Sequence, residues 1–132
     1  MYQNNKDIIG ALDQADYQLN QLKRNRDALI QSFDESLGKL RLPMRLRKRS
    51  GGQLAWRNIA TRSRGQRDLD LSAYKNDLVR MPQPIQRQLM NFERKRIVMN
   101  LNLSLVQHER QQLRHAATKI DLALRYFDNA VV

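Results

Sequence analysis

Cysteine is absent from the 132 residues of this sequence, aromatic residues make up only 6% of it, and it has three prolines and five glycines. Without cysteine, a disulfide scaffold, a thiolate nucleophile, a zinc ribbon and an iron–sulfur site are excluded. The 41% of hydrophobic residues is enough for a core and is not typical of a disordered chain. No apolar run exceeds three residues and the N-terminus has no apolar signal core, so we expect a cytoplasmic protein without membrane contact. The length suits a single domain, 1–132.

Acidic residues are missing altogether from the middle of the chain. The sequence has 24 Lys and Arg against 13 Asp and Glu, a formal net charge of +11. Ten of these cations and no acid lie in residues 39–67, whereas residues 1–38 carry a net charge of −2 and residues 68–132 carry +3. Like charges at this density repel one another. Residues 39–67, called the basic block below, therefore predict a polyanionic partner.

The residues before the basic block have the pattern of a long helix, which we predict over 5–38. Apolar residues recur along one stripe at alternating spacings of four and three. Asn4 or Asn5 is suited to cap the start of this helix, and Gly38 lies where a C-cap is expected.

The residues after the block predict a second and longer helix over 84–129. It starts behind Pro82, and neither glycine nor proline interrupts it after Pro84. Its apolar residues keep the spacings of four and three through six heptads, which is typical of a coiled coil. We therefore expect a mainly α fold, a long antiparallel and coiled-coil-like helical hairpin.

Between the helices the hydrophobic period changes to two, which predicts strands. We expect a small basic antiparallel β-sheet or hairpin over 40–71, with Pro43 on an edge strand, followed by a short helix over 72–80 that Ser72 caps. The apolar face of this sheet, expected to pack on the helices, consists of Leu42, Met44, Leu46, Leu54, Trp56, Leu69 and Leu71.

The long second helix carries a second apolar stripe beside its first. This stripe consists of Ile97, Val98, Leu101 and Leu105. A helix that is apolar over half of its circumference is buried on more than one side. Either a second copy of the chain covers this stripe, which gives a homodimer, or residues 72–80 of the same chain fold over it.

Four residues have more than one interpretation. Arg26, Arg96 and Arg110 occupy positions on the apolar stripes, where each either pairs with an acid on the facing helix or packs its stem at the edge of the stripe. Trp56 is able to stack on an exposed base. However, it lies two residues after Leu54 in a strand with a period of two, so both side chains are expected on the same apolar face, which favours a core position for Trp56.

The basic block has the residue types of a nucleic-acid interface, because the arginine fork pairs bidentately with phosphates and with guanine edges. A two-stranded ribbon fits the major groove of DNA but not the deep, narrow major groove of duplex RNA, so double-stranded DNA is favoured. Arg94, Lys95 and Arg96 extend the basic surface along the second helix. The predicted contact residues are Arg41, Arg45, Arg47, Lys48, Arg49, Arg57, Arg62, Arg64 and Arg67.

Signs of catalysis are few. His108 and His115 are seven residues apart on the predicted helix, about 10 Å along its axis, which is too far to share a metal ion. Gly51 and Gly52 precede a predicted strand rather than a helix, so they do not form a phosphate-binding loop. We expect no enzyme, no cofactor and no metal site.

The order of a long helix, a basic hairpin with Leu54-Ala-Trp-Arg57, and a helix that begins at proline and runs through Phe92-Glu-Arg-Lys-Arg-Ile97 loosely resembles one group of proteins. These are small uncharacterised proteins of integrative and conjugative elements and plasmids of proteobacteria. The resemblance implies a role in maintaining or transferring mobile DNA, as in conjugation, and no catalytic residues.

The expected function is therefore that of a non-enzymatic accessory or regulatory protein that binds DNA through the arginine-rich insertion. Two alternatives remain open. One is a coiled-coil adaptor or structural protein whose basic tip docks on an acidic partner within a larger protein machine. The other is an RNA-binding protein.

Overall fold

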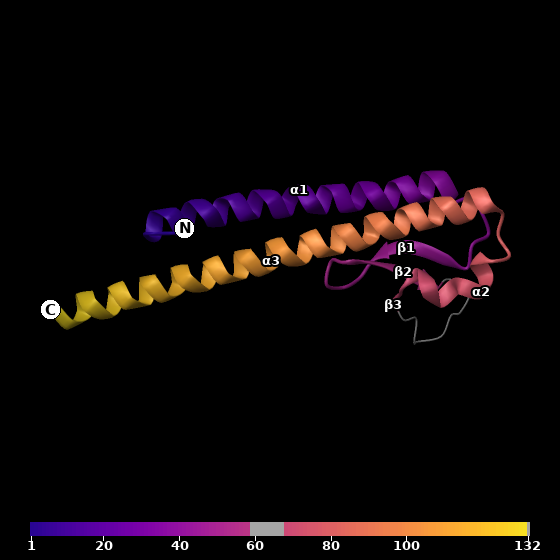
Figure 1. The fold of residues 1–132 in the computed structure, drawn as a ribbon. Helices are drawn as coiled ribbons and strands as arrows, with labels where there is room; N and C mark the ends of the chain where they lie inside the picture. Colours follow the sequence, from indigo (N-terminus) through magenta and orange to yellow (C-terminus); the bar gives the residue numbers. More distant parts are fainter. Residues whose placement is uncertain (59–67, 132) are drawn as a thin grey trace. The chain divides into compact units, whose positions relative to one another are not determined.

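The computed structural model describes residues 1–58 and 68–131. Two long helices dominate this described part of the chain, α1 (Asn5–Leu37) and α3 (Gln83–Val131) (Figure 1). Between them in sequence, the described residues form the strands β1 (Met44–Lys48), β2 (Leu54–Asn58) and β3 (Asp68–Leu69), the 3-10 helix η1 (Leu71–Tyr74) and the single-turn helix α2 (Lys75–Leu78). The predicted fold class, a mainly α antiparallel helical hairpin with a small inserted antiparallel sheet, is confirmed.

The chain divides into two compact units, and each contains a part of both long helices. Residues 1–23 and the part of α3 from Leu103 onward form the helical unit, whereas the residues from Arg24 to Asn102 form the sheet unit. In each unit the α1 segment runs antiparallel to the α3 segment (Figure 1). None of the helices in the described ranges is long and apolar enough to cross a membrane.

Apolar stripe residues and an ion pair hold the helical unit together. The buried apolar residues of this unit are Ala15, Leu19, Leu103 and Leu113. Beside them, the Arg110 guanidinium forms an ion pair with the Asp16 carboxylate on the facing helix. Of the two interpretations of this arginine, pairing with an acid is therefore confirmed.

The ends of the helices follow local sequence signals. The Asn4 side chain accepts a hydrogen bond from the backbone N–H of Asp7 over 2.9 Å, so Asn4 caps α1. At the other end of α1, the Gly38 N–H donates to the Asp34 carbonyl, and a Cβ at Gly38 would clash with that same carbonyl. At the start of α3, the Pro82 carbonyl accepts the first two backbone hydrogen bonds.

The segment predicted as a helix over 72–80 begins earlier and is less regular. A 3-10 turn starts at Leu71 and continues into α2, and Asp70 rather than Ser72 occupies the N-cap position, without a side-chain capping bond. The reason is the burial of Leu71, which is 2% exposed and whose N–H donates to the Glu93 carboxylate. This anchor fixes where the turn begins.

The three strands form an antiparallel sheet in the order β1-β2-β3. Trp56 on the central strand lies opposite Leu46 on β1 and Leu69 on β3. The first strand begins at Met44, after Pro43, because proline has no N–H to donate to a ladder.

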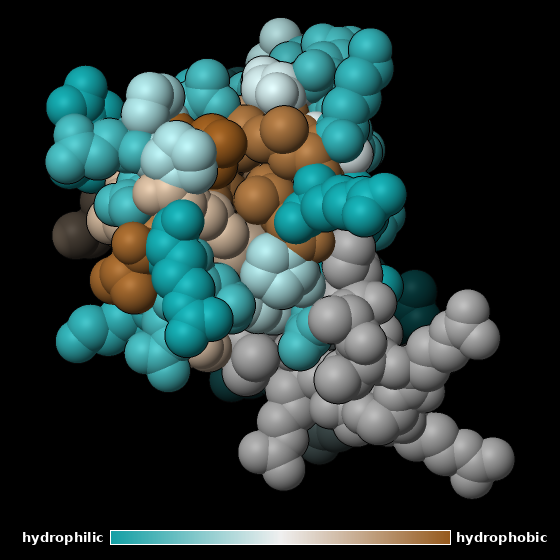
Figure 2. Space-filling view, turned by 90° about the vertical axis from the view of Figure 1, so that its right-hand side faces the viewer, coloured by the Kyte–Doolittle hydropathy of each residue, from teal (hydrophilic) through white to brown (hydrophobic). Residues whose placement is uncertain are grey.

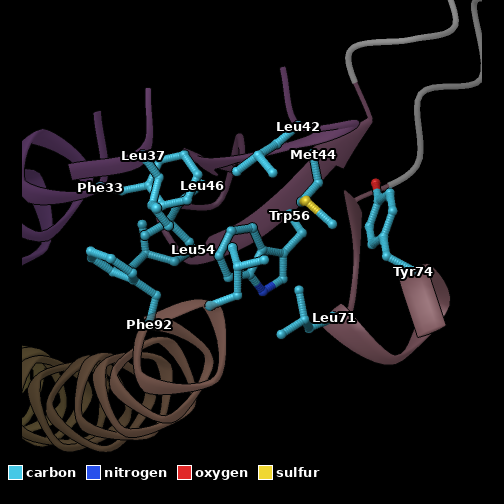
Figure 3. Packing of buried hydrophobic residues seen from close by; sticks show 11 residues of the cluster. Phe33, Leu37, Leu42, Met44, Leu46, Leu54, Trp56, Leu71, Tyr74 and Phe92 are labelled. Atoms are coloured by element: carbon cyan, nitrogen blue, oxygen red, sulfur yellow. The ribbon is translucent and has the colours of Figure 1, made fainter. Parts of the chain in front are cut away.

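The core of the sheet unit gathers apolar side chains of the sheet, α1, η1 and α3 (Figure 3). The Phe33 ring packs edge-to-face on the rings of Trp56 and Phe92, with centroids 5.5 and 5.4 Å away. Trp56 is 0% exposed, so the core interpretation of this residue is confirmed. The side chain of Leu69 lies outside what the structure describes, and the other residues of the predicted apolar face are buried: Leu42, Met44, Leu46, Leu54, Trp56 and Leu71.

The second apolar stripe of α3 faces solvent in this single chain. Ile97, Val98, Leu101 and Leu105 are 54%, 56%, 57% and 58% exposed. Residues 72–80 therefore do not cover the stripe, and that alternative is wrong.

Candidate nucleic-acid interface

The predicted contact residues lie on and around β1 and β2. Those that the structure describes are Arg41, Arg45, Arg47, Lys48, Arg49 and Arg57. Three others, Arg62, Arg64 and Arg67, lie outside the described residues. The described cations before and after β1 are exposed, whereas the three arginines within the strands are half-buried.

The strand register gathers arginines on the face of the sheet opposite the core. Arg45 on β1 lies directly opposite Arg57 on β2, so the two share one face, and Asp68 on β3 is the next residue in that row. Like charges directly opposite each other destabilise a sheet. Arg45 and Arg57 therefore bring two positive charges to one face of the sheet.

Arg47 has a structural contact of its own. Its guanidinium forms an ion pair with Asp34 on α1 over 3.0 Å and donates to the Leu46 carbonyl over 2.7 Å. The two charged side chains are 35% and 42% exposed, so this ion pair contributes little to stability. Arg47 thus links β1 to α1 while part of its side chain remains open to solvent.

The connection from α1 to β1 brings three cations to one hollow. Lys39, Arg41 and Arg45 line it together, and Asp77 is the one acid among its lining residues in the described part of the chain. This connection lies at the end of the sheet unit that Figure 2 shows, where hydrophilic side chains surround a hydrophobic patch. Lys39 is absent from the predicted contact residues because it precedes the first predicted strand. Its position two residues before Arg41 is the sequence feature that could have identified Lys39 as a contact residue.

A buried carboxylate on α3 fixes the position of the sheet. Glu93, which is 8% exposed, accepts hydrogen bonds from the Trp56 indole N–H over 3.0 Å and from the Leu71 backbone N–H over 2.8 Å. Its other oxygen is 2.6 Å from the Arg96 guanidinium. Glu93 therefore joins β2, η1 and α3 in one polar network.

Two further side chains of α3 bind the backbone of β2. The Asn100 amide accepts from the Leu54 N–H over 2.7 Å and donates to the Leu54 carbonyl over 2.8 Å. Arg96 donates to the same carbonyl and forms an ion pair with Asp70 over 3.0 Å. Arg96 is only 8% exposed, so it anchors the sheet, and the idea that it extends the basic surface is wrong.

Sequence analysis missed Glu93 and Asn100 altogether. Glu93, Arg96 and Asn100 are spaced by three and four residues, which places them on one face of the helix. This polar stripe beside the apolar stripe is the sequence pattern that could have identified them.

A buried arginine of α1 holds the turn between β1 and β2. Arg26 is 5% exposed and donates to the Gly52 carbonyl over 2.9 Å. Within the turn, the Gly52 N–H donates to the Arg49 carbonyl, and Gly52 adopts a φ of +92°, which is in the region that favours glycine. Arg26 therefore pairs with a carbonyl of the turn as well as with its neighbour Asp27.

Adding a methyl group at this turn tests the geometry. Gly52→Ala forces a side chain onto a positive φ and places its Cβ 3.3 Å from the Arg26 guanidinium, so we expect a loss of about 1–2 kcal/mol in the free energy of unfolding. Gly51→Ala is the matched control, because a Cβ there meets nothing within 4 Å. Urea unfolding followed by the fluorescence of Trp56 measures both variants. Equal losses in the two would contradict the assigned turn.

Groups for acid–base or metal chemistry are scarce near the sheet. Among the described residues, no three His, Asp or Glu side chains gather closely enough to hold a metal ion. Burial, and secondly the charge of Asp77, raises the pKa of the Tyr74 hydroxyl, so this phenol stays protonated at neutral pH. The hydroxyl is buried and has no hydrogen-bond partner within the described ranges.

Comparison with known proteins finds no family model that matches this chain and no curated protein or solved structure that is significantly similar to it. The resemblance to proteins of integrative and conjugative elements therefore stays an expectation from the sequence. The support for the candidate interface therefore comes from the geometry and charge of its own residues.

Proposed function

We propose that the protein binds nucleic acid, and duplex DNA in the first place, through the basic block. The observation that supports this most is the hollow in which Lys39, Arg41 and Arg45 come together. Arg45 also belongs to the face of the sheet opposite the core, where it lies opposite Arg57. Cations of the α1–β1 connection and of the start of β1 thus line a space that one phosphate group is able to occupy, and phosphate contacts supply most of the affinity of nonspecific DNA binding.

The anchoring of the sheet supports a rigid interface. Glu93, Arg96 and Asn100 fix β2 on α3, and Arg26 fixes the turn between the strands. Cations on a rigid element lose less conformational entropy when they bind than cations on a flexible loop. A two-stranded ribbon such as β1 and β2 has the width that the major groove of DNA admits.

The test is the salt dependence of binding to a random-sequence duplex. Each phosphate contact contributes about 0.9 to the slope of log K against log [salt]. In Arg41→Ala/Arg45→Ala we expect the magnitude of this slope to fall by about 2, with weaker binding at every salt concentration. Fluorescence anisotropy of a labelled duplex gives the slope for each variant.

The matched control is Arg114→Ala/Lys119→Ala, which removes the same net charge from exposed positions of the helical unit. We expect its slope to stay near that of the unchanged protein. An equal fall in both double variants would mean that net charge alone drives binding. Absence of binding by the unchanged protein at about 50 mM salt would overturn the proposal, because the Debye length there exceeds 10 Å.

Competition between the duplex and a structured RNA of equal length separates DNA from RNA as the target. We propose an accessory or regulatory role without catalysis, such as marking a site on mobile DNA. Preferential binding of the structured RNA would replace DNA by RNA in this proposal.

A further inference from the structure

Two hollows along α3 in the sheet unit form a cationic face. One is lined by Arg87, Met90 and Arg94 among others, and the second by Arg94, Lys95 and Val98 among others, so they meet at Arg94. No acidic residue in the described part of the chain lines either hollow. Met90 and Val98 are 46% and 56% exposed. This surface combines exposed apolar side chains with positive charge.

An exposed face of α1 in the helical unit has the opposite charge. Ile9 and Tyr17 are 49% and 63% exposed, and the exposed Asp13 lies between them in sequence. A Cβ added to the neighbouring Gly10 would meet nothing within 4 Å. A glycine inside a helix costs about 1 kcal/mol relative to alanine, and no close contact with the described residues of its own chain explains Gly10. It does leave room for the close approach of another helix.

The two faces match in spacing and in charge. The cationic face has Met90, Arg94 and Val98 at intervals of four residues, and the acidic face has Ile9, Asp13 and Tyr17 at the same intervals. Residues four apart lie on one side of a helix. Whichever way the two helices run, Asp13 therefore meets Arg94 while the apolar residues meet one another.

We propose that the protein associates with a second copy of itself through these faces, with the Ile9–Tyr17 segment of one copy docked along Met90–Val98 of the other. Ile97 and Leu101 flank the cationic face on α3 and are more than half exposed in the single chain. The docked helix would cover part of this second apolar stripe. The association needs no nucleic acid and does not rest on the function proposed above.

Other occupants of the cationic face fit less well. A second copy docked by the same face would set Arg94 and Lys95 against the same two cations, and like charges at an interface are unfavourable. A nucleic-acid backbone would pair with the cations but would leave Met90 and Val98 against phosphates. Among the surfaces of residues 1–58 and 68–131, the acidic face of α1 supplies an acidic group between two apolar groups at the required spacing.

A charge exchange within one chain tests the contact. Sedimentation velocity of the full chain, without nucleic acid, measures self-association. Arg94→Glu and Asp13→Arg each set like charges against each other, so we expect each to weaken self-association about tenfold. The double variant Asp13→Arg/Arg94→Glu restores the pair in reverse and should associate within about threefold of the unchanged protein.

Arg114→Glu is the control, because Arg114 is exposed in the helical unit and belongs to neither face. We expect it to change self-association less than the two single variants of the pair. Circular dichroism checks that all variants remain helical, which we expect because the substituted residues lie at exposed positions of the helices. Three results would overturn the proposal: a monomeric unchanged protein, a double variant as weak as the single variants, or an equal effect of Arg114→Glu.

Discussion

Phe33→Ala should lower the free energy of unfolding of the sheet unit by about 3–5 kcal/mol. The Phe33 side chain is 0% exposed and packs edge-to-face against Trp56 and Phe92. Alanine leaves a cavity at the point where α1, β2 and α3 meet, and it removes two aromatic contacts that are each worth about 0.5–1.5 kcal/mol beyond area burial. The largest part of the loss is the free energy of burying the ring, which the alanine side chain no longer contributes, and the cavity adds to it.

Trp56 is a built-in probe for this measurement because the sequence has one tryptophan. Urea unfolding followed by its emission reports on the sheet unit. Phe127→Ala is the matched control, because the same side chain is 66% exposed there and should change the free energy of unfolding by less than about 0.5 kcal/mol. A loss below about 1 kcal/mol in Phe33→Ala would mean that Phe33 does not join the helices to the sheet.

Phe33 also shows why the fold could be predicted from the sequence. It belongs to a stripe with spacings of four and three, and Trp56 belongs to an alternation with a period of two. Each period identifies one buried face, and two faces of this kind have to cover each other. Helices, strands and core therefore followed from where the apolar residues recur.

The polar contacts could not be predicted in the same way. Periodicity shows that Glu93 lies beside the apolar stripe of a helix, but not that the Trp56 indole and the Leu71 N–H reach it there. Arg96 looked like part of a basic surface because its neighbours in sequence are cations, whereas its burial depends on the fold around it. Long-range pairing between polar groups has no period in the sequence, so only the structure separates anchoring cations from solvent-facing ones.

The network around Glu93 provides the second large effect. Glu93→Gln removes the negative charge but keeps an acceptor for Trp56 and Leu71, so the main change falls on Arg96. Arg96 would then keep as its charged partner Asp70, whose side chain is 76% exposed. Removing one partner of a buried ion pair costs about 3–5 kcal/mol, because the other charge stays buried. We expect a loss of that size in urea unfolding of the sheet unit. If the protein binds DNA as we propose, the same change should also weaken that binding, because the sheet loses its anchor.

The double variant Glu93→Gln/Arg96→Met separates the ion pair from the rest of the network. With both charges gone, no uncompensated charge remains buried, so the double variant should be more stable than the sum of the single losses predicts, by about 1–3 kcal/mol. Glu35→Gln is the control, because Glu35 is exposed and accepts one hydrogen bond from Gln31 on its own helix; we expect a change below about 0.5 kcal/mol. Strict additivity of the two single losses would show that Glu93 and Arg96 stabilise the sheet independently. The sheet would then depend mainly on its apolar core and on Asn100, whose amide binds both the N–H and the carbonyl of Leu54.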